Sequence, residues 1–379
     1  MPITNDALTQ DELDYLVYAT LSETVANKDE MIPLNRPNMP TFNWFMAKAK
    51  KKGDPIRGGY RFNVKGLRGQ KYTWWDGMDL LPFEERYTGT QLKFYVGKGH
   101  MGDILPFDFV ERTGIRIDYE RGIRQGAATK EAVERVVNVI KENADDIKFN
   151  RSYEMAKHIW KSNVDSPKCF TGIDGLLPVT NPTGGTIGGL PRSSPELQHV
   201  VLTGITGDTV MLYFQDAVRK AQRKANGRQV DYLAVGDNFY DLLVNVFSGA
   251  TSAGGPAGTA AGKFDYRSAR DKAMAKGEKM NIALPQDCFM YEDKMIVLEP
   301  MFAELNAEDP TSGWLNRCYG FTSDYLFVIP VLADKSIVHP IPYNQRVQYT
   351  SWHDEMTLAC VHPNSQFVLT TSYNGTGIW

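Results

Sequence analysis

The sequence carries no surplus of positive charge. Its 42 Lys and Arg residues stand against 45 Asp and Glu residues, which gives a formal net charge of -3 at pH 7. Proteins that bind nucleic acid tightly usually carry a basic surplus, because neutralising phosphates supplies most of their affinity. If this chain lies beside DNA, we therefore expect it to enclose the DNA and not to grip it.

Cysteine is also scarce. Cys169, Cys288, Cys318 and Cys360 are scattered along the chain, and no two of them have C-x-x-C spacing. This pattern predicts neither a zinc knuckle nor a disulfide framework. We expect four reduced thiols in a cytoplasmic product.

Long apolar segments are missing as well. The first residues, Met1 to Asp6, lack the basic start and the apolar core of a signal peptide. The longest apolar run, 325–333, contains Pro330 and is far shorter than the roughly 20 residues that span a bilayer. With 42% hydrophobic and 23% charged residues, the 379-residue chain has an ordinary globular composition.

The first 45 residues are expected to form an arm. Pro33, Pro37 and Pro40 favour extended backbone there. Such a segment should bury little against its own chain and gain most of its contacts from another molecule.

Residues 46–102 are expected to form an extended hairpin. Residues 60–65 alternate apolar and polar side chains, as half-buried strands do, and residues 91–96 resemble a second strand. Between them lies an apolar tip, 66–88, with the side chains of Trp74, Trp75, Met78, Leu80 and Leu81. Exposed apolar patches usually mark an interface, so we expect this tip to contact another subunit.

A long helix is predicted over residues 127–163. Apolar residues recur there every three or four positions, and charged residues fill the other face. At about 1.5 Å per residue the helix would exceed roughly 50 Å. The apolar stripe slips near Asn150 to Ser152, which indicates a bend.

A second α/β unit is expected after residue 205. The pattern predicts a helix over 209–226 that ends at Gly227, a strand over 229–235, and a helix over 238–247 capped by Asp237. Strand-rich segments follow at 280–302 and 320–332. Residues 356–361 and 366–371 are expected to close the chain as a hairpin, so the fold class is α+β.

Enzyme-like motifs are present but weak. Gly97 to Gly102 spell G-x-G-x-x-G, yet Pro106 follows too soon for the helix that a dinucleotide site needs. His353, Asp354 and Glu355 are adjacent, and adjacent side chains in an extended strand point in opposite directions. The histidines show no metal-ligand spacing. We predict no catalytic, cofactor-binding or metal-ligating residue, and we expect the chain not to be an enzyme.

The block from Thr171 to Arg192 resembles the signature of tailed-bacteriophage major capsid proteins. In that family a Gly-Leu-Asp-Gly-Leu-like turn follows a long helix and precedes a loop rich in Pro, Thr and Gly that ends in Arg. The matching positions in this sequence are Gly172, Asp174, Gly175, Pro182, Gly184, Gly185, Gly188, Gly189 and Arg192. The closing segment, 356–371, is loosely similar to the family's terminal one.

The resemblance implies the Hong Kong ninety-seven type capsid fold. Its parts would be an N-terminal arm (1–45), an extended hairpin loop (46–102), a peripheral domain with the spine helix 127–163 (103–205), an axial domain (206–319) and closing strands of the peripheral domain (320–379). Candidate contacts between subunits are Arg57, Arg61, Lys71, Trp74, Trp75, Met78, Leu80 and Leu81.

The family's function implies partners. Copies of the chain would form hexamers and pentamers of an icosahedral shell around double-stranded DNA, which they would contact weakly. A scaffold protein, a portal at one vertex and a possible cement protein would take part. Because few residues precede the hairpin, we expect a separate scaffold and no large cleavage.

Two alternatives stay open. A cargo-enclosing compartment shell of the encapsulin kind would share the fold. A nucleotide-dependent oxidoreductase would rest on Gly97 to Gly102 alone.

Overall fold

The computed structural model describes twelve stretches of the chain: 38–50, 58–64, 90–106, 117–118, 122–123, 130–164, 168–180, 182–247, 266–280, 284–285, 287–339 and 347–372. These stretches divide into two compact units. The first unit takes its described residues from 98–155 and 332–354. The second takes them from 37–97, 156–331 and 355–379.

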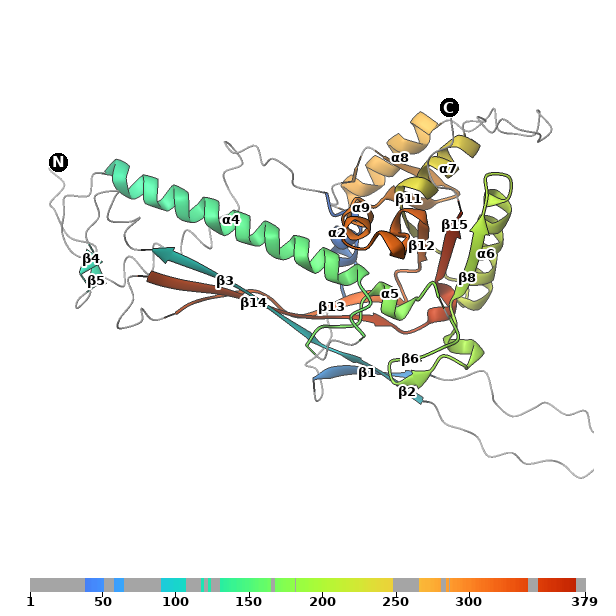
Figure 1. The fold of residues 1–379 in the computed structure, drawn as a ribbon, viewed down its shortest axis with the longest axis horizontal. Helices are drawn as coiled ribbons and strands as arrows, with labels where there is room; N and C mark the ends of the chain where they lie inside the picture. Colours follow the sequence, from blue (N-terminus) through green and yellow to red (C-terminus); the bar gives the residue numbers. More distant parts are fainter. Residues whose placement is uncertain are drawn as a thin grey trace, which may run out of the picture. The chain divides into compact units, whose positions relative to one another are not determined.

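A six-stranded mixed sheet forms the core of the second unit (Figure 1). Its order is β10-β11-β9-β12-β15-β8, with β9 parallel to β11, β8 parallel to β15 and the other pairs antiparallel. The strands are β8 (Val200–Ile205), β9 (Tyr232–Val235), β10 (Cys288–Tyr291), β11 (Lys294–Leu298), β12 (Arg317–Phe321) and β15 (Phe367–Thr371). All residues of β9 and β12 are buried, so these two strands form its centre.

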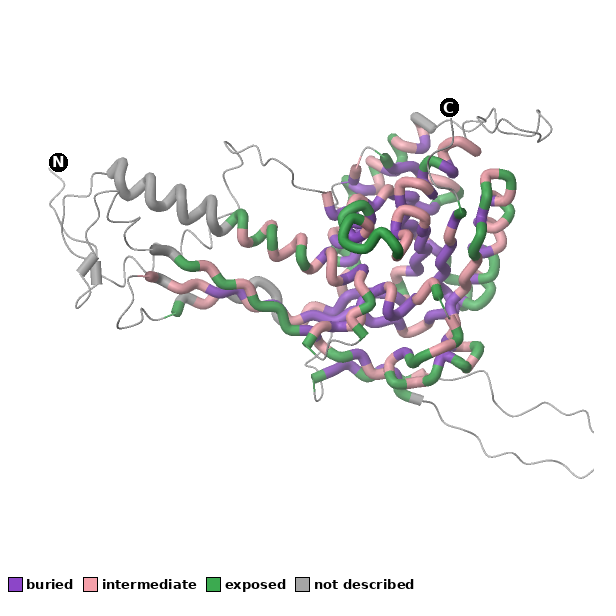
Figure 2. Tube along the Cα trace, viewed as in Figure 1, coloured by how far each residue is buried: buried purple, intermediate pink, exposed green. Residues whose placement is uncertain are grey.

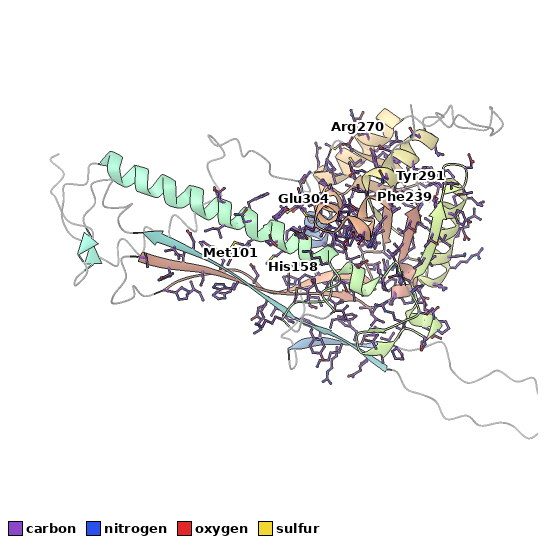
Figure 3. The ribbon with its side chains drawn as sticks, viewed as in Figure 1. Met101, His158, Phe239, Arg270, Tyr291 and Glu304 are labelled. Atoms are coloured by element: carbon purple, nitrogen blue, oxygen red, sulfur yellow. The ribbon has the colours of Figure 1, made fainter. Side chains whose placement is uncertain are left out.

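Four helices accompany this sheet: α6 (Val210–Lys224), α7 (Asp237–Phe247), α8 (Tyr266–Lys279) and α9 (Met301–Glu308). Phe214 of α6 and Phe239 of α7 lie in one buried cluster with Leu233 of β9. Figure 2 shows buried residues concentrated along these strands, and Figure 3 places Phe239 among their side chains.

The sequence predicted the elements that follow residue 205 well. The predicted helix over 209–226 is confirmed as α6, and Gly227 follows it with a φ of 80°. The predicted strand over 229–235 begins later, at Tyr232, and the helix predicted over 238–247 begins one residue earlier, at Asp237.

Helix α4 (Lys130–Trp160) confirms the long helix predicted over 127–163. Its 31 residues give a length of about 46 Å, somewhat short of the expected length. Helical structure continues through Asn150 to Ser152. Among the described residues no helix is both long enough and apolar enough to cross a membrane.

A three-stranded sheet has the strand order β13-β14-β3. Each of its strands, like α4, has residues in the first unit. Its strands are β3 (Gly97–Pro106), β13 (Leu326–Val338) and β14 (Val347–Cys360). In the first unit, Arg151 of α4 and Asp354 of β14 form an ion pair with a distance of 3.1 Å between Nε and Oδ2. The same unit contains the short antiparallel pair β4 (Ile117–Asp118) and β5 (Gly122–Ile123).

The predicted hairpin strands are confirmed as a two-stranded antiparallel ribbon in the second unit. Strand β1 (Gly59–Val64) pairs with β2 (Thr90–Tyr95), and Phe62 lies opposite Leu92. The predicted tip, 66–88, lies outside the described residues.

The predicted closing hairpin is wrong. Strand β14 lies beside β13 and β3, whereas β15 pairs with β12 and β8 in the other sheet. A 3₁₀ turn at Pro363–Ser365 redirects the chain between them. The side chain of Gln366 holds this corner, because its Oε1 accepts the N–H of Thr322 at 2.8 Å. Strand β14 therefore stays beside the preceding strand β13, whereas β15 satisfies its backbone with strands distant in sequence.

The expectation for the end of the arm is also wrong. Residues 40–47 form helix α2 (Pro40–Ala47) instead of extended backbone, because proline is favoured at the first helical position. Trp44 is 1% exposed and stacks on Tyr232 with 4.5 Å between ring centroids. Phe45 packs against Phe321 with the rings tilted and 5.5 Å between centroids. This part of the arm belongs to the core of its own chain.

The division into arm, hairpin loop, peripheral domain and axial domain stays a prediction. One sheet crosses two of its boundaries, since β8 precedes residue 206 and β15 follows residue 320.

Trp44→Ala should lower the free energy of unfolding by about 3–5 kcal/mol, because it leaves a cavity and removes the stacking on Tyr232. Met46→Ala is the matched control in the same helix, since Met46 is 37% exposed, and should change it by no more than about 0.5 kcal/mol. Urea unfolding followed by circular dichroism measures both. Equal losses in the two variants would contradict the docking of α2.

Candidate functional site

The signature turn packs against the end of α4 through its glycines. Helix α5 (Ile173–Leu176) follows Gly172, whose N–H donates to the Ser162 carbonyl at 3.2 Å. A Cβ atom on Gly172 would lie 2.7 Å from the carbonyl oxygens of His158 and Ile159. A Cβ atom on Gly175 would collide with the Ser162 carbonyl. Only glycine allows this approach of two backbones.

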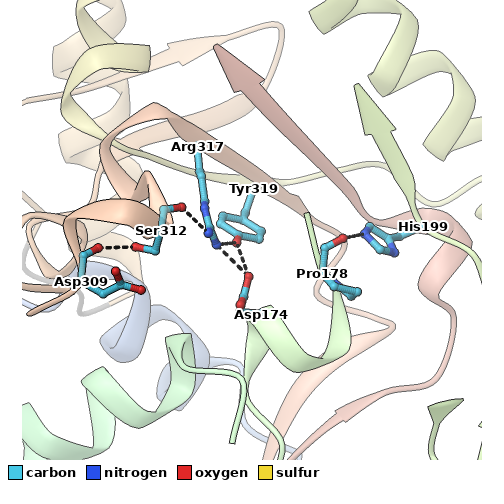
Figure 4. Close-up of polar contacts among 7 residues, drawn as sticks. All are labelled: Asp174, Pro178, His199, Asp309, Ser312, Arg317 and Tyr319. Atoms are coloured by element: carbon cyan, nitrogen blue, oxygen red, sulfur yellow. Dashed lines mark hydrogen bonds and ion pairs between the residues drawn. The ribbon is translucent and has the colours of Figure 1, made fainter. Parts of the chain in front are cut away.

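An ion pair joins the same turn to the six-stranded sheet (Figure 4). Arg317 Nη1 at the start of β12 donates to Asp174 Oδ1 at 2.7 Å and to the Tyr319 hydroxyl at 2.9 Å. Its Nη2 donates to the Ser312 carbonyl at 2.6 Å, and its Cζ lies 4.1 Å from the centroid of the Trp314 ring. The guanidinium group therefore has partners on three segments.

Arg192, the last residue of the signature block, binds the C-terminal end of α5. It is 2% exposed, and its two terminal nitrogens donate to the carbonyls of Leu176 and Gly175 at 2.7 and 2.6 Å. These carbonyls have no partner inside so short a helix. Burial, and then the nearby Arg192 cation, lower the pKa of His199 to about 4. The neutral His199 ring is within 2.9 Å of the Pro178 carbonyl.

The glycine-rich part of the block forms a small hairpin. Strands β6 (Thr186–Ile187) and β7 (Leu190–Pro191) are joined by Gly188 and Gly189, whose φ angles are 55° and 84°. Two consecutive positive φ angles are what a two-residue hairpin turn of type I′ requires. The Gly188 carbonyl accepts the N–H of Lys93 in β2 at 2.9 Å. The signature block thus fixes the root of the β1–β2 ribbon.

The geometry makes the signature block a mechanical junction between α4, the sheet and the ribbon. The sequence motif includes the glycines of this junction, Asp174 and Arg192. It does not include Arg317 and Tyr319. A signal existed, because Arg317 is a charged residue at the start of an otherwise apolar strand. Its partner, 143 positions away, could not be read from spacing.

The candidate contact residues lie mostly outside the described part of the chain. Arg61 is the exception, and it is exposed on β1. The others, Arg57, Lys71, Trp74, Trp75, Met78, Leu80 and Leu81, stay predictions.

Gly97 to Gly102 do not form a dinucleotide-binding loop, and His353 and Asp354 do not form a relay. Gly97 to Gly102 lie within strand β3, where a dinucleotide site needs a loop that leads into a helix. A Cβ atom on Gly97 would lie 2.6 Å from the Phe170 nitrogen, so this glycine serves packing. His353 and Asp354 point to different partners, as predicted, with His353 bonded to Ser351 and Asp354 paired with Arg151.

Metal ligands and disulfides were considered in the sequence as well. In the part of the chain that the structure describes, no three His, Cys, Asp or Glu side chains are grouped to hold a metal ion. All four cysteines are free thiols.

Comparison with known proteins points to one fold. No protein-family model and no curated protein matches the sequence. Among solved structures, a chain of the cyanophage A-1(L) capsid asymmetric unit matches with a TM-score of 0.55 at 11% identity, covering 91% of this chain and 96% of that chain. The capsid of cyanophage P-SCSP1u matches with a TM-score of 0.50 at 9% identity over 92% of each chain.

A third match, the capsid of Myoviridae phage XM1, has a TM-score of 0.50 at 8% identity and covers 91% of this chain and 96% of that chain. The chain has the phage capsid fold. The predicted α+β class and the resemblance to tailed-phage capsid proteins are thereby confirmed. Within the capsid fold, the signature block is the place where the long helix meets the central sheet.

The capsid fold of this chain also encloses a carboxyl group. Glu299 is 2% exposed at the point where α2 and α9 begin. Its oxygens accept the N–H groups of Thr41 and Met301, both at 3.3 Å. Helix N-termini favour an anion, yet burial raises the pKa of Glu299 to about 7. The cost of burying the charge therefore exceeds what the two donors return.

Asp174→Ala should lower the free energy of unfolding by about 3 kcal/mol, because it leaves the Arg317 guanidinium buried without its anion. Asp216→Ala removes an exposed carboxylate from its pair with Lys220 on α6 and should cost less than about 0.5 kcal/mol. Urea unfolding measures both. Equal free energies of unfolding in the two variants would show that the pair of Asp174 and Arg317 contributes no more than an exposed ion pair.

Glu299 should make stability fall with rising pH. Between pH 4.5 and 7 the folded protein keeps a proton that the unfolded chain has released. Its contribution is complete below pH 4.5 and is lost by pH 7, a change of about 3 kcal/mol. Glu299→Gln should flatten this dependence in urea unfolding at pH 5 and pH 8. Glu304→Gln, at an exposed position of α9, should leave it as in the wild type; parallel profiles for all three proteins would refute the assignment.

Proposed function

We propose that this chain is the major capsid protein of a tailed bacteriophage. Copies would form the hexamers and pentamers of an icosahedral shell that encloses double-stranded DNA, assembled in the host cytoplasm and found in the virion. The observation that carries this proposal is the phage capsid fold, matched over 91% of this chain and 96% of a cyanophage capsid chain.

The anchored ribbon supports a role in assembly. Its root is held by the bond between Lys93 and Gly188 and by the close contact of Gly97 with Phe170. Strand β1 precedes residues 65–89 and strand β2 follows them, so both ends of this segment are attached to the ribbon. That segment carries Trp74 and Trp75. We infer that it binds a neighbouring subunit, because exposed apolar side chains of this kind usually mark an interface.

The net charge fits enclosure of DNA. At -3 the chain has no overall attraction for phosphates. In this proposal the DNA is contacted weakly and without sequence preference. A scaffold protein, a portal and a possible cement protein complete the set of partners.

The proposed subunit performs no catalysis. Support comes from Gly97 to Gly102, a nucleotide-site motif in the sequence, which lies within a strand. An encapsulin-like shell would have the same fold, and the contents of the particle distinguish the two: packaged DNA supports a phage head, and an enclosed enzyme supports a compartment.

Electron microscopy of the protein expressed with its scaffold should show closed shells. Trp74→Ser with Trp75→Ser should give folded, soluble protein that fails to close them, because the tip loses its apolar contacts. Trp74→Phe with Trp75→Phe is the matched control and should still assemble. Normal shells from the serine variant would refute the role of the tip, and a wild-type protein that stays monomeric at high concentration would refute the capsid assignment.

A further inference from the structure

Histidines from three strands gather on the sheet of the first unit. His100 lies on β3, His353 on β14, and His339 directly after β13. The chain has six histidines in all, so half of them meet here. Neither the signature junction nor the capsid proposal uses them.

Two of these rings stand at a chelating distance. The ring centroids of His100 and His353 are 4.9 Å apart, and the ring planes are inclined by 60°. A transition-metal ion lies about 2.0 Å from an imidazole nitrogen and thus about 3.2 Å from the ring centroid. Two rings that share an ion at a near-tetrahedral angle therefore have centroids about 5 Å apart.

Ser351 supplies the second layer of such a site. Its hydroxyl lies 3.0 Å from Nε2 of His353 and 2.7 Å from Nε2 of His339. When the Nε2–H of His353 donates a hydrogen bond to this hydroxyl, the hydroxyl can donate its own hydrogen bond to Nε2 of His339. Nδ1 of His353 then carries no proton and is free to bind an ion. Hydrogen bonds of this kind, from the second ring nitrogen, hold metal-binding histidines in place.

The pair is partly exposed, because His100 is exposed and His353 is half-buried. Asp354 is 6% exposed and binds Arg151 of α4. Successive side chains of a strand point to opposite faces, so His353 points away from α4. His100 is exposed, and within the described residues its ring nitrogens have no hydrogen-bond partner. Solvent therefore reaches the pair at His100.

We propose that His100 and His353 chelate one divalent transition-metal ion of the Cu²⁺, Ni²⁺ and Zn²⁺ class. Two protein ligands leave the remaining positions to water, which agrees with the lack of a three-ligand group among the described residues. Copper binds tightest in this class, because the affinity of nitrogen sites rises from Ni²⁺ to Cu²⁺ and falls at Zn²⁺. Imidazole must be neutral to bind, so protons displace the ion at low pH.

Titration of the full chain with Cu²⁺ tests the proposal by calorimetry and electron paramagnetic resonance. One ion per chain should bind at pH 7.5 with two imidazole nitrogens in the spectrum. His100→Gln and His353→Gln should each abolish the two-nitrogen signal. His362→Gln, which alters a histidine of the second unit, should keep the two-nitrogen signal. Ser351→Ala should weaken binding about tenfold.

Circular dichroism spectra of the variants should match that of the wild type, which separates lost ligands from lost folding. A wild-type protein that binds no more Cu²⁺ than the double variant His100→Gln with His353→Gln would overturn the proposal. So would a two-nitrogen signal that persists in that double variant. Neither outcome depends on whether shells form.

Discussion

The junction at the signature turn depends on the buried cation of Arg317. Arg317 is 8% exposed, and a guanidinium group removed from water is stable only when its donors are satisfied. Its partners are a carboxylate in α5, a hydroxyl in its own strand and a carbonyl in the loop before β12. Moving any of these segments would leave the buried charge of Arg317 without one of its partners. The cation therefore fixes where the signature turn, the loop and the central sheet meet.

The glycines of the signature block act on the same junction by a different physical route. At Gly172 and Gly175 a side chain would collide with carbonyl groups at the end of α4. At Gly188 the constraint is the positive φ of a two-residue turn. These requirements bear on the backbone, so they restrict few positions and leave most side chains free to vary. A fold held in this way can be shared at 8–11% identity.

The sequence allowed local structure to be predicted and left pairing over long distances open. Helices α4 and α6 and the β1–β2 ribbon were predicted because their periodicity is contained in neighbouring residues. The closing hairpin failed because strands β14 and β15, which follow each other in sequence, belong to different sheets. Helix α2 failed because a proline-rich segment was interpreted without Trp44 and Phe45, whose partners lie far along the chain.

The same distinction applies to the candidate sites. The signature glycines could be found from their spacing, but the contact between His100 and His353 joins residues on two strands that are far apart in sequence. A strand places its side chains on alternate faces, so Arg151 binds Asp354 on one face and leaves His353 on the other. The ion pair that ties α4 to β14 thus also determines which face of β14 carries the histidine. The contact between Arg151 and Asp354 therefore sets the position of the His353 side chain.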